Sequence, residues 1–455
     1  MKKYTMNKEI NLLNRTEDYN YFFGFHDISC WNRNEDKMAA LRIRDITTPP
    51  VSNMSCDVGF INLNRTFIKL GETLAYNYPQ GARQQFIGDS NLLIVNDVVD
   101  GQWGSKIYDT DRLQLKSSHR FSTHVITKEG EAFGIDYARL FRLGAYGYNG
   151  GIKDLYAGFP APDNTGIFKH NVFTGAGKLM LSIKEVANFC LKESISPNHY
   201  ITHLLLSPNE RRIAFLHRYK LKDGGETTRL MTISVDGEGL RCIATGFLSH
   251  FDWKSDHEIT IYGRFGTKVE GLRNSLLYKL LPSGPLAVSK KLIKRLIRHN
   301  SLARTNMHDA LAWHVFTDED EPRHSFLAKG IITEDGHPMF CPVNRDWMIC
   351  DTYPDKQGIR TLFLFQHSTQ TRINLGTYEM LHMKPDMNKV MNTIELLDKS
   401  VLKKSSIEDL IFTRSGLHCD LHPRWMPASK MVNFDSIHEG YRSVYAYDVS
   451  QFVTA

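Results

Sequence analysis

The sequence has few of the features that mark disulfide-bonded, membrane-spanning or nucleotide-binding proteins. Its seven cysteines contain no C-x-x-C pair, so we expect reduced thiols in a cytoplasmic protein. No run of 18 apolar residues occurs, and the basic N-terminus lacks the apolar segment of a signal peptide, so no transmembrane segment is predicted. The G-x-S-x-G, P-loop and G-x-G-x-x-G motifs are missing, which argues against a propeller-gated serine peptidase and against nucleotide binding.

The composition is that of a folded protein with much β structure. A chain of 455 residues exceeds what one ordinary hydrophobic core serves, so it contains several domains or one repetitive architecture. Aromatic residues make up 11% of the chain, and together with 32 glycines they favour strands and turns. The net charge of +6 and the 19 histidines suit an acidic ligand, but the charge is too small to indicate nucleic acid.

A pattern of a polar residue, an apolar strand, a turn and a second apolar strand recurs along the chain. Seven copies begin near residues 25, 80, 124, 203, 250, 337 and 422. In the last copy, turns separate the predicted strands Met431–Asp435 and Ser443–Asp448. One such sheet cannot bury its own faces, and small sheets repeated around an axis form a β-propeller. The sequence therefore predicts an all-β fold: a seven-bladed β-propeller over residues 1–455, with helical or loop insertions on one face.

Uneven spacing of the copies predicts two insertions. The first, 143–171, is rich in glycine and tyrosine. The second, 286–306, interleaves lysine and arginine with leucine and isoleucine, which is typical of an amphipathic helix. It is either a solvated surface helix or a region, 286–304, that contacts an anionic polymer or a membrane surface.

Histidine recurs at or just before the first strand of six copies. These residues are His26, His124, His203, His250, His337 and His422, and the remaining copy has Gln80 or Gln84 there. The first strands of a propeller line its central channel, so at least three of the histidines are expected to share a metal or substrate site. Neutral imidazoles suit Mn, Fe, Ni, Cu or Zn. The alternative is that each histidine satisfies strand-end hydrogen bonds, and Pro338 and Pro423 predict extended backbone at the residues before them.

Three arginines are candidates for binding an acidic ligand. Arg218 follows a histidine at the exit of a strand and either contacts a carboxylate or makes a surface salt bridge. Arg139 and Arg142 are expected at a strand end before the first insertion.

Asp420 and His418 lie close to His422 in the last copy. In an extended segment, residues 418, 420 and 422 face one way, which predicts either a His-Asp-His ligand set or a supporting layer that orients the ligand.

Several segments resemble a known family. The stretches Thr202–Tyr219 (THLLLSPNERRIAFLHRY), Ser249–Trp253 and the closing HPRWMPASKMVNFDS resemble the oligogalacturonate lyase branch of the TolB-like propellers. FFGFHDISCW, AYNYPQGARQQF, DYARLFRLGAYGY, DGHPMF with its following DTYP, and CDLHPRW also make the chain similar to a broader set of bacterial propellers, often associated with polysaccharide gene clusters.

The resemblance implies a propeller that splits uronate-containing oligosaccharides by β-elimination with a divalent metal, typically manganese. By position, His203 matches the family's general base, His250 a metal ligand, and His422 the last histidine of a Gln-x-x-His-Pro-His-Pro motif. The chain departs from that motif, since Leu417 stands in place of glutamine and Asp420 in place of the first histidine.

Together these features predict a metal-assisted lyase that acts on an acidic glycan. His203 would be the base and Arg218 the partner of the substrate carboxylate. The expected metal ligands are His250, His337 and His422, and the expected substrate contacts are Gln84, His124, Arg139 and Arg142. Two alternatives stay open: a non-catalytic glycan- or protein-binding propeller in a polysaccharide pathway, and a glycoside hydrolase that uses paired carboxylates from Asp27, Asp252 and Asp420.

Overall fold

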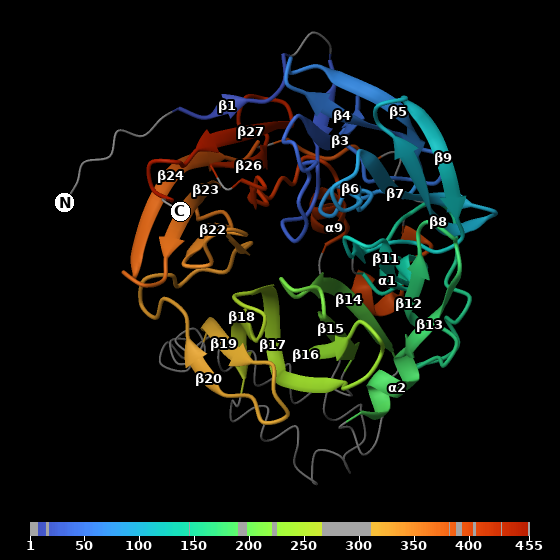
Figure 1. Ribbon diagram of the computed structural model, residues 1–455. Coiled ribbons are helices and arrows are strands. Elements are labelled where there is room, and N and C mark those ends of the chain that lie inside the picture. Colours follow the sequence, from blue (N-terminus) through green and yellow to red (C-terminus); the bar gives the residue numbers. More distant parts are fainter. Residues whose placement is uncertain are drawn as a thin grey trace. The chain divides into compact units, whose positions relative to one another are not determined.

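The protein is described by a computed structural model, with strands far outnumbering helices (Figure 1). The residues described are 8–14, 18–144, 146–189, 198–220, 225–265, 311–381, 383–387, 394–403, 406–428 and 430–453. The predicted amphipathic helix at 286–306, with its proposed membrane contact, lies outside them. The chain folds into two compact units. The first comprises Met1–Leu155, Ile167–Leu179 and Gly336–Ala455, and the second Tyr156–Gly166 and Met180–Asp335.

Five of the sheets are four-stranded and antiparallel, and four of these join strands that follow one another in the chain. The first is β2 (Asn20–Phe22), β3 (Lys37–Ile43), β4 (Cys56–Asn62) and β5 (Phe67–Thr73). The second is β6 (Gln85–Phe86), β7 (Leu92–Val99), β8 (Gln102–Asp109) and β9 (Gln114–His119). The third is β10 (Val125–Ile126), β11 (Glu131–Ile135), β12 (Gly166–Asn171) and β13 (Gly177–Ser182). The fourth is β21 (Met339–Phe340), β22 (Trp347–Asp351), β23 (Ile359–Gln366) and β24 (Thr371–Glu379).

The remaining four-stranded sheet combines both ends of the chain. It consists of β25 (Arg424–Trp425), β26 (Met431–Ser436), β27 (Ser443–Asp448) and the N-terminal β1 (Ile10–Asn11). Strand β1 pairs with β27 through Ile10↔Ala446 and Asn11↔Tyr445. The predicted strand Ser443–Asp448 is confirmed, and the partner that covers its outer edge comes from the start of the sequence.

In the second unit, one sheet of seven strands contains a long strand whose two halves pair with different neighbours. It runs from β14 (His199–Leu206) through β15 (Arg212–Lys220), β16 (Glu226–Ser234), β17 (Arg241–Trp253), β18 (Glu258–Phe265) and β19 (Ala312–Thr317) to β20 (His324–Phe326). The first half of the long β17 pairs with β16, and its second half pairs with β18. The seven-blade count itself stays a prediction.

The sheets repeat one another in detail. A register shift interrupts the pairing of the third strand with the fourth in four places, at Val58/Gly59, Ile107/Tyr108, Leu230/Met231 and Leu362/Phe363. Burial also follows strand order, because β7 and β22 are largely buried whereas β9 and β24 are largely exposed. Bulges of this kind increase twist at sheet edges. The repeat read from the sequence is therefore also a repeat of sheet geometry.

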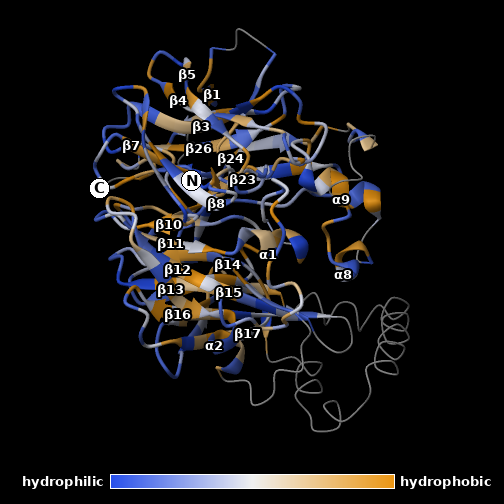
Figure 2. Cartoon of the chain, turned by 90° about the vertical axis from the view of Figure 1, so that its right-hand side faces the viewer, coloured by the Kyte–Doolittle hydropathy of each residue, from blue (hydrophilic) through white to orange (hydrophobic). Residues whose placement is uncertain are grey.

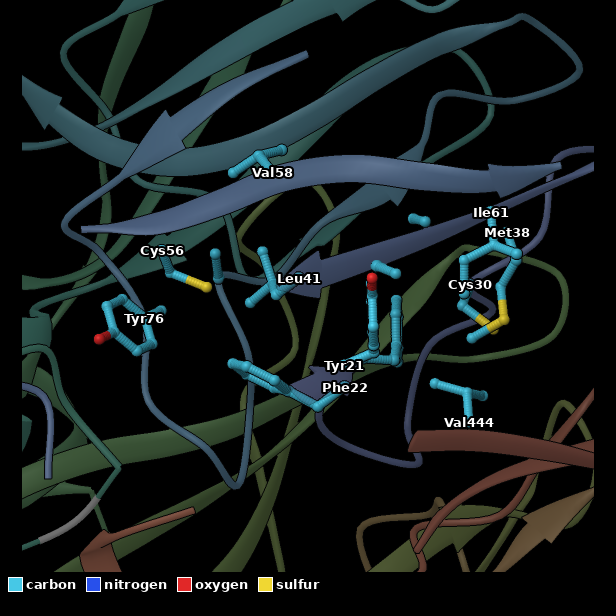
Figure 3. Close-up of a cluster of buried hydrophobic side chains, with 14 of the residues drawn as sticks. Tyr21, Phe22, Cys30, Met38, Leu41, Cys56, Val58, Ile61, Tyr76 and Val444 are labelled. Atoms are coloured by element: carbon cyan, nitrogen blue, oxygen red, sulfur yellow. The ribbon is translucent and has the colours of Figure 1, made fainter. Parts of the chain in front are cut away.

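Hydrophobic residues line the strands, and polar residues occupy the turns between them (Figure 2). In the first unit, a core gathers Tyr21, Phe22, Met38, Leu41 and Val58 from the first sheet, and Val444 of β27 packs with them (Figure 3). All of these side chains are less than 10% exposed. This core holds the N-terminal strands against the C-terminal sheet, which is the setting of the histidine site described below.

The four helices described are short. They are α1 (Tyr137–Arg142), α2 (Ile183–Asn188), α8 (Lys399–Leu402) and α9 (Ile407–Arg414). Arg139 and Arg142 therefore lie on a helix and not at a strand end as expected, because Asp136 caps the N-terminus directly after β11. The predicted insertion 143–171 is also shorter than expected, since residues 166–171 form β12. Among the described helices, none combines the length and the apolar character needed to cross a bilayer.

Candidate functional site

Three of the six recurring histidines come together in the first unit. The ring centroids of His337 and His422 are 4.3 Å apart, and that of His26 lies 5.3 Å from the first and 6.1 Å from the second. All three side chains are buried, and Phe25 packs edge-on against His422 at 4.9 Å. These three of the six recurring histidines thus lie together, and their sharing of a metal or substrate site stays a prediction.

A carboxylate orients His337. Its Nδ1 lies 2.8 Å from Asp351 Oδ1, and its backbone N–H donates to the same oxygen at 2.8 Å. An ionised carboxylate only accepts, so Nδ1 carries the proton and Nε2 is the unprotonated nitrogen of the neutral ring. Gly336 makes this possible, because a Cβ there would lie 1.9 Å from the carbonyl oxygen of Asp351. This is the histidine–carboxylate pairing that supports metal ligands in proteins.

His422 adopts a backbone conformation that the sequence did not predict. Its φ is +43°, in the left-handed region, whereas the proline that follows it favours extended backbone. The prediction of an extended His422 is therefore wrong. In the observed conformation its N–H donates to Asp351 Oδ2 at 3.2 Å, so one carboxylate holds both histidines. Strained residues of this type cluster at functional sites.

Burial lowers the pKa of His422 well below its usual value, and the neighbouring His337 lowers it further. The ring is therefore neutral near pH 7 and has a lone pair available. Its Nδ1 is buried without a hydrogen-bond partner among the described residues. Such a nitrogen is costly to bury unless something binds to it.

Asp420 supplies an anionic group beside the two imidazoles. Its Oδ1 lies 2.6 Å from Arg360 Nη1, and its Oδ2 lies 3.2 Å from His418 Nε2 and 3.9 Å from His422 Nε2. Burial alone would raise the pKa of Asp420, but Arg360 and His418 hold it well below its usual value. The carboxylate is thus ionised in spite of being buried.

These groups can hold a metal ion. One ligand atom each from His337, Asp420 and His422 lies within 4.8 Å of the others, and all three residues are buried. Two neutral imidazoles and one carboxylate form a ligand set that suits a divalent first-row metal and leaves coordination positions open. The positive charge of Arg360 disfavours a nearby cation. Arg360 pairs with Oδ1 of Asp420, however, whereas Oδ2 of Asp420 is the oxygen nearest the imidazole of His422. The donor set therefore fits a metal.

His124, the fourth of the recurring histidines in the first unit, belongs to an adjoining polar network. Its Nδ1 lies 2.8 Å from the hydroxyl of Tyr137, and its Nε2 lies 3.9 Å from Asp27 Oδ2. Arg83 donates to Asp27 at 2.7 Å and to the carbonyl of His124. Burial raises the pKa of Asp27, and Arg83 opposes that shift. His124, predicted to contact substrate, is held by buried protein groups.

The second unit holds His203 and His250, and both lie at β-bulges. The pairing of β14 with β15 shifts between Thr202 and Leu205, and His203 has a φ of +56°. The pairing of β17 with β18 shifts between Leu248 and Phe251. Bulges re-aim side chains and are common next to active sites. Here they mark two positions that the sequence also singled out.

The partners of these two histidines differ. The Nδ1 of His250 lies 3.1 Å from Asp335 Oδ1, which resembles the pairing of a histidine with a carboxylate in the first unit. His203 Nδ1 lies 2.9 Å from the hydroxyl of Thr202. Their predicted roles, metal ligand and general base, stay predictions.

The other predicted contact residues make internal bonds. Gln84 is fully buried, and its side chain donates to Phe23 and accepts from Ala82. Arg139 and Arg142 both pair with Asp154, at 3.4 and 2.7 Å. In the second unit, Arg218 hydrogen bonds the hydroxyl of Tyr200, which Glu226 also contacts.

Two residues of the candidate site were not singled out by sequence reasoning. Asp351 is the last residue of β22 and follows an apolar run. An acidic residue at the end of a buried strand is the sequence signal that could have identified Asp351. Arg360 lies in β23, whose pattern IRTLFLFQ reads as an ordinary strand. Nothing in that pattern reveals that its guanidinium is buried against Asp420.

The fold and the histidine group define a mostly β protein with a candidate metal site, similar in fold to oligogalacturonate lyases. A structure of oligogalacturonate lyase from Vibrio parahaemolyticus superposes with a TM-score of 0.55 at 12% identity, over 98% of this chain and 97% of that chain. A structure of oligogalacturonate lyase in complex with manganese gives a TM-score of 0.52 at 13% identity, over 95% and 90%. No family model matches the sequence, and no curated protein matches it. At these identities the similarity concerns the fold.

Proposed function

We propose that the protein is a metal-assisted lyase that cleaves an acidic, uronate-containing oligo- or polysaccharide by β-elimination. The observation that carries the proposal is the buried group of His337, Asp420 and His422 within a fold shared with oligogalacturonate lyases. Manganese is the proposed metal, because a carboxylate ligand suits Mn²⁺ and one of the similar structures is a manganese complex.

In this proposal His337, His422 and Asp420 hold the metal, and His250 is the further predicted ligand. A bound divalent cation would neutralise the substrate carboxylate and so acidify the C–H beside it. Asp351 keeps His337 in the tautomer that presents Nε2, and the hydrogen bonds to Asp351 fix both histidines before ligand binds.

His203 is the proposed base, and Arg218 the proposed partner of the substrate carboxylate. A neutral imidazole takes the proton from the carbon next to the carboxylate. The electron pair of that C–H bond forms the new C=C bond, the C–O bond on the adjacent carbon breaks, and the leaving sugar hydroxyl takes up a proton. The left-handed backbone of His203 supports a functional role, because such strain is kept where the surrounding structure requires it.

The test is to incubate the protein with several uronate polymers and follow the ultraviolet absorbance of an unsaturated product. Activity should disappear with chelator and return with Mn²⁺, and His203→Ala should remove it. His257→Ala is the matched control, since that histidine is exposed in the same unit. Activity that ignores both chelation and His203→Ala would overturn the proposal.

Two other outcomes point to different functions. Metal-free protein that yields no product from any polymer indicates a non-catalytic binding propeller. New reducing ends without an unsaturated product indicate a glycoside hydrolase. The cytoplasm as the site of this reaction is part of the same proposal.

A further inference from the structure

The inference concerns Arg360, the second residue of β23. It is among the largest fully buried side chains, with 1% of its surface exposed. Arginine is rarely buried to this extent unless it is paired, because removing a guanidinium from water is unfavourable. Its environment therefore has to supply acceptors for its N–H groups.

The described residues supply fewer acceptors than the guanidinium of Arg360 needs. Arg360 Nη1 forms an ion pair with Asp420 Oδ1 at 2.6 Å. Yet Nε, Nη1 and Nη2 make no hydrogen bond of normal geometry with the described residues. A guanidinium has five N–H donors in a planar fork, and one carboxylate oxygen cannot accept all of them. Buried donors in this number call for a further acceptor.

The surroundings of Arg360 connect it to the candidate metal site and to solvent. Asp420 is shared between Arg360 and the group that includes His422. The ring of Tyr353 lies 5.9 Å from the guanidinium carbon and 5.4 Å from the ring of His337. Tyr353 is 37% exposed, and the side chain of His418 is 17% exposed. Tyr353 and His418, two side chains around this group, therefore both reach solvent.

We propose that Arg360 recognises the carboxylate of the sugar that binds at the His337–Asp420–His422 group, and so selects acidic over neutral sugars. The planar fork of a guanidinium matches the two oxygens of a carboxylate. A neutral sugar offers no such acceptor and leaves the buried donors unpaired. The inference rests on the proposed function for the identity of the ligand.

The experiment measures binding without turnover. Galacturonate and galactose differ in ring substituent only by the carboxylate, so calorimetric titration of each into the Mn²⁺-loaded full chain gives the preference for the acidic sugar. In the native protein galacturonate should bind more tightly. In Arg360→Met its affinity should fall by about 10- to 100-fold, the usual worth of hydrogen bonds to a charged group, while galactose binding stays unchanged.

Two further variants separate recognition from structure. Arg360→Lys keeps a positive charge beside Asp420 but lacks the fork, so it should fold like the native chain and still lose most of the preference. Arg112→Met, which removes a side chain that is 76% exposed, should keep the preference. Circular dichroism and Mn²⁺ stoichiometry are measured for each variant, and Arg360→Lys decides the question if Arg360→Met does not fold.

The outcomes are distinct. A native chain that binds neither sugar, or that does not prefer galacturonate, overturns the inference. Unchanged preference in Arg360→Lys and Arg360→Met also overturns it. If galacturonate binds through Arg360 and no polymer yields an unsaturated product, the inference stands and the lyase proposal fails.

Discussion

Two groups of buried histidines in this protein have opposite chemistry. In the first unit, His337 donates from Nδ1 to the carboxylate of Asp351. In the second unit, Arg229 donates from Nε and Nη2 to Nδ1 of His217, at 3.0 and 2.8 Å. Nε2 of His217 must then carry the proton, and it lies 3.0 Å from Nδ1 of His199. Both nitrogens of His217 lie within hydrogen-bonding distance of protein groups, whereas Nδ1 of His337 is held by a carboxylate.

The partner of the imidazole therefore decides whether a buried histidine can bind a metal. A carboxylate sets the proton on one nitrogen and increases the basicity of the other. A guanidinium donates hydrogen bonds to the lone pair of the ring nitrogen, which then cannot bind a metal. Arg229 also donates to the carbonyls of Val186 and Phe189, which ties helix α2 to the sheet. The second group thus stabilises structure, and the first contains the proposed metal ligands.

The largest expected effect comes from removing a ligand of the first group. His422→Ala should weaken Mn²⁺ binding by more than about 100-fold, because loss of a ligand exceeds the effect of losing a supporting residue. Calorimetric titration measures it. His257→Ala should bind as the native chain does, and equal affinity for the two variants would remove His422 from the site.

In the second group, the effect should appear in stability. Arg229→Met leaves two carbonyls and Nδ1 of His217 without a donor, and it should lower the free energy of unfolding by about 3 kcal/mol. Urea denaturation measures this change, and Mn²⁺ affinity should be unaffected. Arg112→Met should stay within about 0.5 kcal/mol of the native value. A loss below about 1 kcal/mol for Arg229→Met would mean that the cluster is not structural.

Removing the carboxylate that supports His337 should lower Mn²⁺ affinity less than removing a ligand does. Asp351→Asn keeps the shape but removes the charge, and it should lower Mn²⁺ affinity by about 10- to 100-fold. Asp89→Asn, at a side chain 76% exposed, is the control. If Asp351→Asn binds Mn²⁺ as the native chain does, the comparison between carboxylate and guanidinium partners is wrong.

The smallest expected effect is on the pH dependence of stability. Burial lowers the pKa of His217 well below 6.5, and Arg229 and His199 lower it further. The unfolded chain binds a proton below pH 6.5 that the folded chain excludes, so stability is full above that pH and falls below it. Each such histidine contributes up to about 1.4 kcal/mol per pH unit. The decline between about pH 6.5 and 5 should be shallower in His217→Gln and unchanged in His257→Gln. Equal slopes would contradict this account.

Much of the sheet structure could be predicted from the sequence, because alternation and turn residues are local signals. The predicted strands Met431–Asp435 and Ser443–Asp448 match β26 and β27. The gathering of His26, His337 and His422 followed from the repeat. Their detailed geometry did not, because His422 has a left-handed backbone and its N–H donates to Asp351, which lies 71 residues away.

The buried arginines illustrate the other limit of sequence reasoning. Arg229 and Arg360 lie in strands whose patterns place no special demand on them. The partners of Arg229 come from another strand and a helix, and the partner of Arg360 comes from the loop before β25. The sequence singled out Arg218, which is next to His217, as a candidate for binding an acidic ligand. The guanidinium that hydrogen bonds His217 is instead that of Arg229. Side-chain partners across strands carry no local signal.

The central claim is that a metal ion binds at His337, Asp420 and His422. Anomalous X-ray diffraction from crystals grown with Mn²⁺ tests it most directly, because it locates the metal without reference to activity. The account predicts a peak within bonding distance of all three side chains. A peak elsewhere, with none at this group, would contradict it.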